Sequence, residues 1–470
     1  MRRAELLQIT VERFKSFEAR TTVDLAPLTV VVGRNNSGKS SLIQTLLLLK
    51  QTLTEPRPEV PLHLDGTVNA FNLRELTSGW PEQGEHVPGP TIGLRWACDV
   101  DMGVRLLRRN DGLNKVGESL RLPGLGALAN GEGIARLVTA LEVGLADESG
   151  TTVLTHVDVS YPELCDGPVA RVQQNDGEWR LYWHGQLTDN ASVSLEHFVP
   201  RVHFSPIWGR GASANGVSAL SRNRILQRVL TGPLDALERL LADFQYLGST
   251  RFAPPALYRA SNVAPQDIGA SGELAAQLLH RRQKDVVHYL PPLEVTEAGV
   301  KIPVEVRERP LVGAVNDVLK GLSIEAPVSI DEIREVGFRV LFGSASLAHV
   351  GRGLTYLLPL VELGLFADPL RFTRVGSDLA PDDYRERCDA VTHVAFEEPE
   401  SHLHPKVQSR LAHWMVSLAM SNRRLIVETH SDHLVRRLRG LVARAGADSE
   451  LEKWLLENVR IVEVEQGADG

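Results

Sequence analysis

The chain has 470 residues, enough for one large domain or for two or three domains of ordinary size. Lysine and arginine number 51 against 59 aspartate and glutamate residues, and the resulting net charge of −8 excludes a generally basic nucleic-acid-binding protein. The 3 cysteines lie far apart and no apolar run reaches membrane-spanning length, so we expect a soluble, cytoplasmic protein without a disulfide framework and without membrane contact.

Four segments follow one another along the chain, distinguished by the period of their apolar residues. Residues 1–90 contain strand-like alternation, a glycine-rich loop and an apolar helix. Residues 91–210 consist of short alternating runs with turn signals, which predicts an inserted antiparallel β lobe. Residues 211–334 have mostly helical spacing, and residues 335–470 return to alternating strands and helices. We therefore predict an α/β fold whose two halves are separated by a β lobe and a helical lobe.

The first functional motif is the loop from Gly33 to Ser40, which lies between a predicted strand and a predicted helix. Its residues are Gly33, Arg34, Asn35, Asn36, Ser37, Gly38, Lys39 and Ser40, followed by Ser41. The spacing is that of a P-loop, whose backbone N–H groups and following helix end surround phosphate oxygens. We expect Lys39 to contact the β- and γ-phosphates of ATP and Ser40 to ligate Mg²⁺.

Two carboxylates, Glu397 and Glu398, come directly after an apolar strand predicted for residues 391–396. Buried carboxylates are costly unless they meet a cation or water. We expect Glu397 to hold Mg²⁺, directly or through water, and Glu398 to act as general base toward the attacking water. The same acids would also suit the positive end of a helix, so the motif by itself leaves a structural role open.

The next predicted strand ends in Glu428-Thr429-His430-Ser431. His430 at such a strand end would contact the γ-phosphate, whereas Ser431 or Asp432 would cap the helix that follows. On that helix Arg436, Arg437, Arg439 and Arg444 either face DNA or are solvated near its negative end. For the pair His402 and His404 we favour a structural turn over a zinc site.

Several motifs together resemble the ABC-type ATPase heads of the SMC, RecF and OLD superfamily, and in particular OLD-like bacterial AAA-family ATPases without coiled-coil arms. In chain order they are Phe14–Phe17, Pro27–Ser40, Tyr246–Gly248 with Arg251 and Tyr258, Val350–Leu354, Glu398–Pro405 and Glu428–Ser431. The resemblance implies a P-loop NTPase of the ABC/SMC-head type, with the two lobes inserted between the Walker A motif and the signature and Walker B motifs.

The resemblance also assigns roles to individual residues. Ser40 and Glu397 would be the magnesium side of the site, Glu398 the catalytic base and His430 the switch histidine. The segment Val350–Thr355, with Gly351 and Gly353, would be the signature motif that meets the γ-phosphate bound to a partner subunit. Heads of this kind would form a homodimer, or a higher homo-oligomer, around ATP.

Proteins that this chain resembles serve in DNA maintenance or in phage-defence operons such as Septu and PARIS. The resemblance thus implies an ATPase and sensor component of an anti-phage complex that acts with a separate nuclease or other effector, with DNA as a further partner. No TOPRIM nuclease domain is expected after His430. Two alternatives remain: a nucleotide-gated scaffold with little turnover, which the presence of Glu398 disfavours, and a RecF-like DNA-repair clamp, which the net charge of −8 disfavours.

Overall fold

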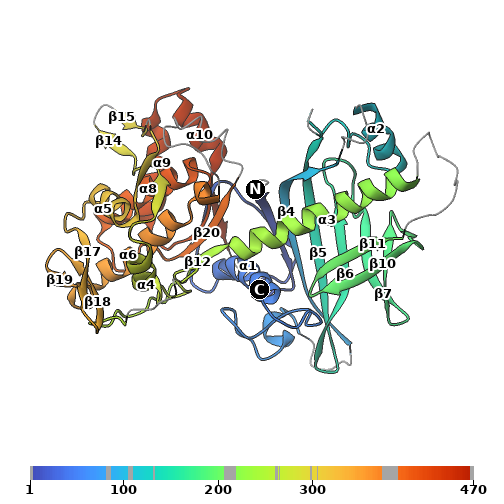
Figure 1. Cartoon of the computed structure of the whole chain (residues 1–470), viewed down its shortest axis with the longest axis horizontal. Coiled ribbons are helices and arrows are strands. Elements are labelled where there is room, and N and C mark those ends of the chain that lie inside the picture. Colours follow the sequence, from blue (N-terminus) through green and yellow to red (C-terminus); the bar gives the residue numbers. More distant parts are fainter. Residues whose placement is uncertain are drawn as a thin grey trace. The chain divides into compact units, whose positions relative to one another are not determined.

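The structure, a computed structural model, describes residues 4–80, 86–103, 110–130, 133–205, 219–259, 263, 265–296, 299–303, 305–372 and 390–465. Within this part of the chain two compact units can be distinguished (Figure 1). The P-loop unit contains Leu25–Ser40 and Asp243–Glu465, and the β unit contains the N-terminal residues up to Asp24 together with Ser41–Ala242. The β unit therefore interrupts the P-loop unit in the sequence.

The β unit is built from antiparallel strands. They are β1 (Ala4–Glu12), β2 (Thr21–Asp24), β4 (His86–Asp101), β5 (Ile134–Glu148), β6 (Thr151–Ser160), β7 (Ala170–Asn175), β8 (Glu178–Trp183), β9 (Gln186–Leu187), β10 (Ala191–Glu196) and β11 (Val199–Phe204). The main sheet has the order β2-β1-β4-β5-β6-β7-β8-β9, and β10 pairs with β11. Side chains along the first half of β5 are alternately buried and partly exposed, as expected for a strand with one face on a core.

In the described part of the chain, the α-helices that accompany these strands are α1 (Lys39–Leu53), which begins in the P-loop unit, α2 (Asn110–Ser119) and α3 (Ala219–Asp243). The N-terminal strand β1 pairs with β4 on one side and with β2 on the other. The first strands of the chain thus belong to the same sheet as the inserted β segment. The helical segment that follows is divided, since α3 lies in the β unit and the residues after it lie in the P-loop unit.

A parallel sheet forms the centre of the P-loop unit. Its strands are β3 (Leu28–Gly33), β12 (Gln245–Leu247), β20 (Thr392–Glu397), β21 (Arg423–Glu428) and β22 (Val459–Val464). They follow the order β12-β20-β21-β3-β22, and each neighbouring pair is parallel. Every side chain of β20 is buried, which explains why this strand reads as a continuous apolar run in the sequence.

Helices and short strands complete the P-loop unit. They are α4 (Ala275–Arg282), β13 (Val286–Tyr289), β14 (Glu294–Thr296), β15 (Gly299–Lys301), β16 (Arg307–Pro310), α5 (Leu311–Gly321), β17 (Val328–Ile333), β18 (Gly337–Phe342), β19 (Ala345–Ser346), α6 (Arg352–Phe366), α8 (Pro405–Met420), α9 (Asp432–Ala445) and α10 (Glu450–Asn458). Of these, α8 packs against both β21 and α9.

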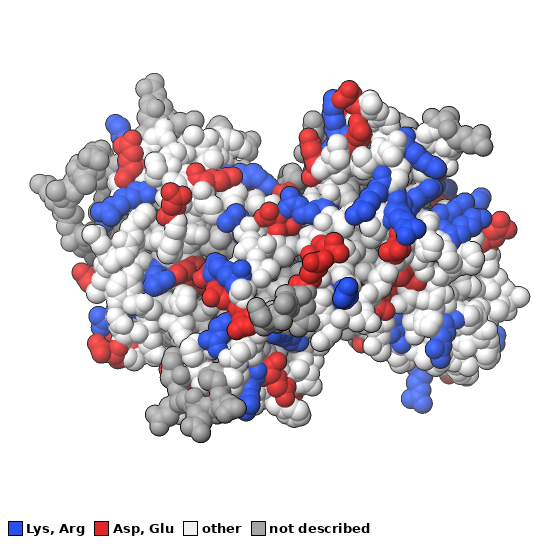
Figure 2. Space-filling view, turned by 180° about the vertical axis from the view of Figure 1, so that it is seen from behind, with Lys and Arg blue, Asp and Glu red and all other residues white. Residues whose placement is uncertain are grey.

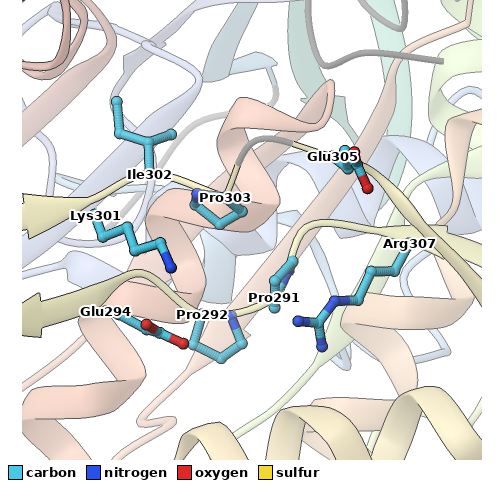
Figure 3. Close-up of a pocket in the computed structure, with 8 residues that line it drawn as sticks. All are labelled: Pro291, Pro292, Glu294, Lys301, Ile302, Pro303, Glu305 and Arg307. Carbon is cyan, nitrogen blue, oxygen red and sulfur yellow. The ribbon is translucent and has the colours of Figure 1, made fainter.

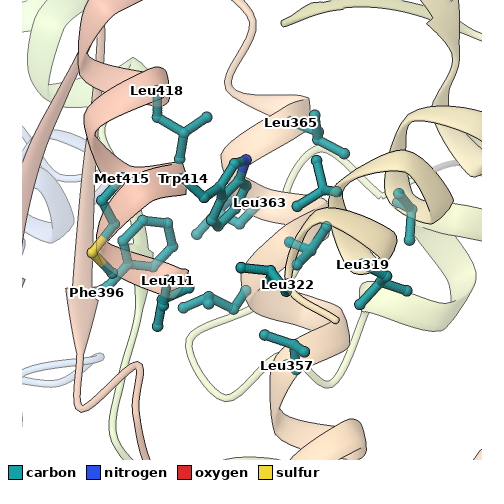
Figure 4. Packing of buried hydrophobic residues seen from close by; sticks show 14 of the residues in the cluster. Leu319, Leu322, Leu357, Leu363, Leu365, Phe396, Leu411, Trp414, Met415 and Leu418 are labelled. Atoms are coloured by element: carbon teal, nitrogen blue, oxygen red, sulfur yellow. The ribbon is translucent and has the colours of Figure 1, made fainter. Parts of the chain in front are cut away.

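The core of the P-loop unit lies where α8 meets α6. The fully buried Trp414 of α8 is surrounded by leucines of both helices (Figure 4). Gly364 of α6 allows this approach, because a Cβ atom at that position would lie 2.5 Å from the Trp414 ring. The packing holds α8 firmly beside the strands that carry the acidic motifs.

The predicted fold class is confirmed. A mixed α/β P-loop fold has its N-terminal and C-terminal parts separated in sequence by an antiparallel β insertion. Among the described residues, no helix combines the length and the apolar character needed to cross a membrane. Basic and acidic side chains are interspersed on the face shown in Figure 2.

Candidate nucleotide-binding site

The site lies at the carboxyl edge of the parallel sheet, because every strand there runs in the same direction and its following loop emerges at that edge. Glu397 at the end of β20 is in register with Glu428 at the end of β21. The Glu398 backbone N–H donates to the Glu428 carbonyl at 2.8 Å, and the Thr429 N–H donates to the Val31 carbonyl at 3.1 Å. These bonds hold the strand ends beside the P-loop that follows β3.

The P-loop from Gly33 to Ser40 joins β3 to the first residues of α1. Asn36 and Gly38 have φ angles of 64° and 103°, which turn successive peptide groups of the loop. Lys39 is buried, and its Nζ donates to the Arg34 carbonyl at 2.7 Å, while the buried Ser37 hydroxyl has no hydrogen-bond partner in the described part of the chain. Arg34, Asn35 and Asn36 are exposed. The loop thus combines an ammonium group, a hydroxyl group and a helix N-terminus, which together suit a phosphate.

Gly33 begins this loop and has a distinct steric role. A Cβ atom at Gly33 would lie 2.3 Å from the carbonyl oxygen of Val464, the residue opposite it on β22. The close approach of two parallel strands therefore requires glycine here.

Ser40 forms the link between the P-loop and the acidic strand ends. Its hydroxyl donates to Oε1 of Glu428 at 2.9 Å, and Oε2 of Glu428 is buried with no hydrogen-bond partner among the described residues. Burial raises the pKa of Glu428 to about 7, and the negative charges of Glu397 and Glu398 add to this effect, whereas the Ser40 hydrogen bond and Lys39 oppose it. Sequence reasoning assigned no role to Glu428, although its position at the end of a buried strand was a usable signal.

Glu397 lies in the neighbouring part of the same cluster. Its Oε2 accepts the Ser249 N–H at 3.2 Å, and its Oε1 is buried without a hydrogen-bond partner in the described part of the structure. Burial raises the pKa of Glu397, against the opposing effects of hydrogen bonds from Tyr246 and Ser249 and of the Arg251 charge. Arg251 also donates from Nη2 to the Glu397 carbonyl at 2.9 Å. Tyr246 belongs to β12, and Ser249 and Arg251 follow it. The Tyr246–Gly248 motif and the residues after it therefore hold the Glu397 carboxylate in place.

The residues present fit a magnesium ion that accompanies a nucleotide. The Ser40 hydroxyl and the unpartnered oxygens of Glu397 and Glu428 are hard oxygen donors, the kind that Mg²⁺ prefers. Within the described residues no cluster of three histidine, cysteine, aspartate or glutamate side chains could hold a metal. Magnesium sites that use few protein ligands are usually completed by phosphate oxygens and water.

Glu398 follows β20 in a left-handed backbone conformation, with φ of 44°. A non-glycine residue in this region costs of the order of 1 kcal/mol, and such strain is often found at functional sites. The half-buried side chain accepts the Ser401 hydroxyl through Oε2 at 2.9 Å. The carboxylate thus stands at the strand tip, held from one side by the turn that follows it.

His430 follows β21, and its side chain is exposed. Its backbone N–H donates to Oε1 of the buried Glu400 at 2.7 Å, which ties the His430 segment to the turn after β20. Ser431 is the N-cap of α9 and accepts the Leu434 N–H at 3.2 Å. The capping role predicted as an alternative is therefore filled by Ser431, and the imidazole of His430 remains available to a ligand. Glu400 was not predicted as a site residue.

The signature-like segment begins α6. Gly351 is the N-cap of this helix and is exposed, and no side chain caps the helix there. A Cβ atom at Gly353 would lie 2.7 Å from the carbonyl oxygen of His402, so this glycine touches the turn that also holds Glu398. His402 makes an edge contact with the Tyr356 ring at 5.0 Å, and His404 caps α8 by accepting the Lys406 N–H. The two histidines thus occupy a structural turn.

The fold and this edge of the sheet define an ATP-binding P-loop protein. Residues 5–75 match the family model described as "AAA ATPase domain", and residues 346–436 match the model described as "AAA domain, putative AbiEii toxin, Type IV TA system". The first match contains the P-loop, and the second contains the acidic motifs. Sequence features of AAA ATPases are therefore found both before and after the insertion. None of the curated proteins compared with this chain matches it.

Solved structures of SMC heads are among those similar to this chain. An Smc head bound to the C-winged helix domain of ScpA is 11% identical, with 92% of this chain and 91% of that chain covered and a TM-score of 0.37. The SMC head domain from Thermotoga maritima is 10% identical, with 92% of each chain covered and a TM-score of 0.33. An Smc head domain with an extended coiled coil, bound to the C-terminal domain of ScpA derived from Pyrococcus furiosus, is 10% identical, with 92% of each chain covered and a TM-score of 0.35.

Proposed function

We propose that this protein hydrolyses ATP in a Mg²⁺-dependent reaction at the edge of the parallel sheet. The observation that carries the proposal is the hydrogen bond of 2.9 Å between Ser40 of the P-loop and Glu428, beside the unpartnered carboxylate oxygen of Glu397. The P-loop and the acidic strand ends thus meet through a direct hydrogen bond. Mg²⁺, when bound, would neutralise charge on the phosphate oxygens.

The residues around this point have separate roles in the proposed reaction. The backbone N–H groups of the loop and Lys39 bind the phosphates of ATP. The Ser40 hydroxyl would be a ligand of Mg²⁺. Glu398 accepts a proton from the attacking water, because it is the half-buried carboxylate at the tip of β20 whose Oε2 the Ser401 hydroxyl already orients. His430, exposed at the neighbouring strand tip, donates to the γ-phosphate as charge develops.

Dimerisation around ATP is the second part of the proposal. The exposed, uncapped N-terminus of α6 at Gly351 offers backbone N–H groups that can bind a phosphate on a second subunit. Gly353 packs on the His402 carbonyl, four residues after Glu398. A phosphate docked at α6 would therefore act on the turn that holds the catalytic base.

At the biological level we propose an ATPase component of an anti-phage complex with a separate nuclease effector. The support is the sequence resemblance to OLD-like ATPases and the match of residues 346–436 to a family whose description names a toxin of a toxin–antitoxin system. The scaffold and the RecF-like clamp are the competing functions. Measurable ATP turnover would distinguish an ATPase from the scaffold. Tight, salt-sensitive binding of DNA ends would indicate the RecF-like clamp.

The direct test measures ATP turnover and molecular mass in solution for wild type, Lys39→Ala and Glu398→Gln, with Glu457→Gln on α10 as an exposed control. We expect Lys39→Ala to lose ATP binding and Glu398→Gln to retain ATP in a dimer with turnover reduced at least 100-fold. Normal ATP turnover by Glu398→Gln would show that Glu398 is not the catalytic base. ATP-dependent assembly of wild type without turnover would establish the scaffold function instead.

A further inference from the structure

A polar cavity lies in the P-loop unit, formed by residues that the nucleotide site does not use. It has a volume of about 600 Å³ and is lined by the segment Pro291–Thr296, Arg307, the end of α5, Arg410 and His413 of α8, and Arg437 of α9. This volume is in the range of small-molecule sites. An adjoining cavity of about 230 Å³ shares Pro291, Pro292, Glu294 and Arg307 with it, and its labelled residues are drawn in Figure 3.

Positive charge gathers on the helical wall of the larger cavity. Arg410 of α8 donates to the Gly321 carbonyl at 3.2 Å, and Arg437 of α9 donates from Nε to Nε2 of His413 at 2.6 Å. Neither arginine pairs with a carboxylate within the described residues. Lys320, at the end of α5, is exposed on the same lining. The remaining guanidinium N–H groups of Arg410 and Arg437 are thus available to bind an anion.

His413 keeps Arg437 in place without neutralising it. The imidazole is 5% exposed, and burial together with the charges of Arg437 and Arg410 lowers its pKa to about 4. At neutral pH His413 is therefore an uncharged acceptor for the Arg437 Nε–H group. Burial lowers the pKa of Arg437, and repulsion from Arg444 and Arg410 adds to the effect.

The acidic residues of the lining do not compensate these cations. Asp317 accepts the Tyr289 hydroxyl through Oδ2 at 2.7 Å, and the same oxygen pairs with Arg307 and Arg309 at 3.3 and 3.2 Å, so two other arginines already balance the charge of this carboxylate. Glu294 is an exposed residue of β14. Pro291 and Pro292 form an apolar part of the same lining, the proline wall, which could cover the flat face of a base.

We propose that this cavity binds a terminal phosphate group carried by a nucleotide, separately from the P-loop. Arg410 and Arg437 hold the phosphate, since guanidinium groups offer paired donors that match its oxygens, and the proline wall contacts the nucleoside. Such a phosphate could come from a free nucleotide or from the 5′ end of a nucleic-acid strand. The site makes no use of P-loop residues, so it can be tested in a protein whose P-loop is disabled.

The test is calorimetric titration of the Lys39→Ala protein with four probes: AMP, inorganic phosphate, a 5′-phosphorylated hexathymidylate and the same oligonucleotide without the phosphate. We expect AMP or the phosphorylated oligonucleotide to bind, and the double change Arg410→Gln, Arg437→Gln to weaken that binding at least tenfold. Arg436→Gln is the matched control, because Arg436 lies on the same helix but is exposed and paired with Asp432. It should bind as the parent does.

The probes identify the source of the phosphate. Binding of AMP alone indicates a free nucleotide, and binding of the phosphorylated oligonucleotide alone indicates a strand end. Equal binding of both oligonucleotides, or affinity that survives the double change, would overturn the proposal, as would the absence of binding by every probe. Arg437→Lys, which retains the charge, should recover part of the affinity in a folded protein and thus separates loss of binding from loss of structure.

Discussion

Replacing Glu428 by glutamine tests the arrangement of the acidic strand ends. Glu428 is 5% exposed and lies with Glu397 and Glu398 near one edge of the sheet. Glutamine has nearly the same shape, and its side-chain oxygen can still accept the hydrogen bond from the Ser40 hydroxyl. The substitution therefore removes a negative charge from a crowded, buried position and changes little else.

The expected magnitude follows from the pKa of about 7 for Glu428 against an ordinary value of 4.5. In the unfolded chain the carboxyl loses its proton near pH 4.5, whereas in the folded protein it keeps the proton until about pH 7. The unfolded state thus binds fewer protons in this range, and the stabilising contribution is lost as the pH rises through 7. The loss reaches about 3 kcal/mol at most, and we expect about 2 kcal/mol because the protein relaxes around the charge.

The assay is denaturant unfolding of wild type and Glu428→Gln at pH 5 and pH 8, with and without Mg²⁺ and ATP. Without nucleotide the variant should be about 2 kcal/mol more stable than wild type at pH 8, and the two should differ less at pH 5. Added Mg²⁺ and ATP should stabilise wild type more than the variant, because only wild type offers the ionised oxygen to the metal. A variant that is less stable at pH 8, or that responds equally to Mg²⁺ and ATP, would refute the arrangement.

Two further predictions concern other parts of the P-loop unit. Gly353→Ala should lower the unfolding temperature more than Gly351→Ala does, because its Cβ would lie 2.7 Å from the His402 carbonyl oxygen, whereas no atom of the described residues lies within 4 Å of a Cβ at Gly351, where alanine is only a poorer N-cap; equal melting curves would contradict this contact. The buried His393, whose pKa burial and the Arg424 charge lower to about 3, stays neutral when the unfolded chain binds a proton, so stability should fall by about 1.4 kcal/mol for each pH unit below 6.5. His393→Gln should show a smaller slope between pH 6.5 and pH 5 in denaturant titrations, and an unchanged slope would assign the acid sensitivity to other groups.

The order and type of the main elements could be predicted because each carries a strong local pattern. The P-loop lies between β3 and α1, and the strand predicted for residues 391–396 corresponds closely to β20. Sheet membership could not be predicted in the same way. The apolar residues from Leu6 to Val11 predict a strand, but they do not reveal that β1 pairs with β4, about eighty residues later, and not with the parallel sheet.

The candidate site was predictable to the extent that its residues stand in recognisable motifs. The P-loop spacing predicts the roles of Lys39 and Ser40, and the position of Glu398 after a buried strand predicts a catalytic base there. Glu428 also ends a buried strand, but its hydrogen bond with Ser40 could not be predicted, because that contact depends on the register that places β21 between β20 and β3. Arg410 and Arg437 are a similar case, since they approach one cavity only through the packing of α8 against α9.

The geometry also indicates how binding and catalysis would be coupled. The negative charges of Glu397 and Glu398 add to the larger effect of burial in disfavouring ionised Glu428, so repulsion at Glu428 weakens the fold where the strands end once its carboxyl is ionised. A cation brought in with ATP would reverse the sign of that interaction, so part of the binding free energy would come from relief of repulsion. Because Glu398 also belongs to the turn that Gly353 contacts, the relief would reach the N-terminus of α6. ATP binding at one subunit would thereby favour the conformation of the surface that we propose to meet the other.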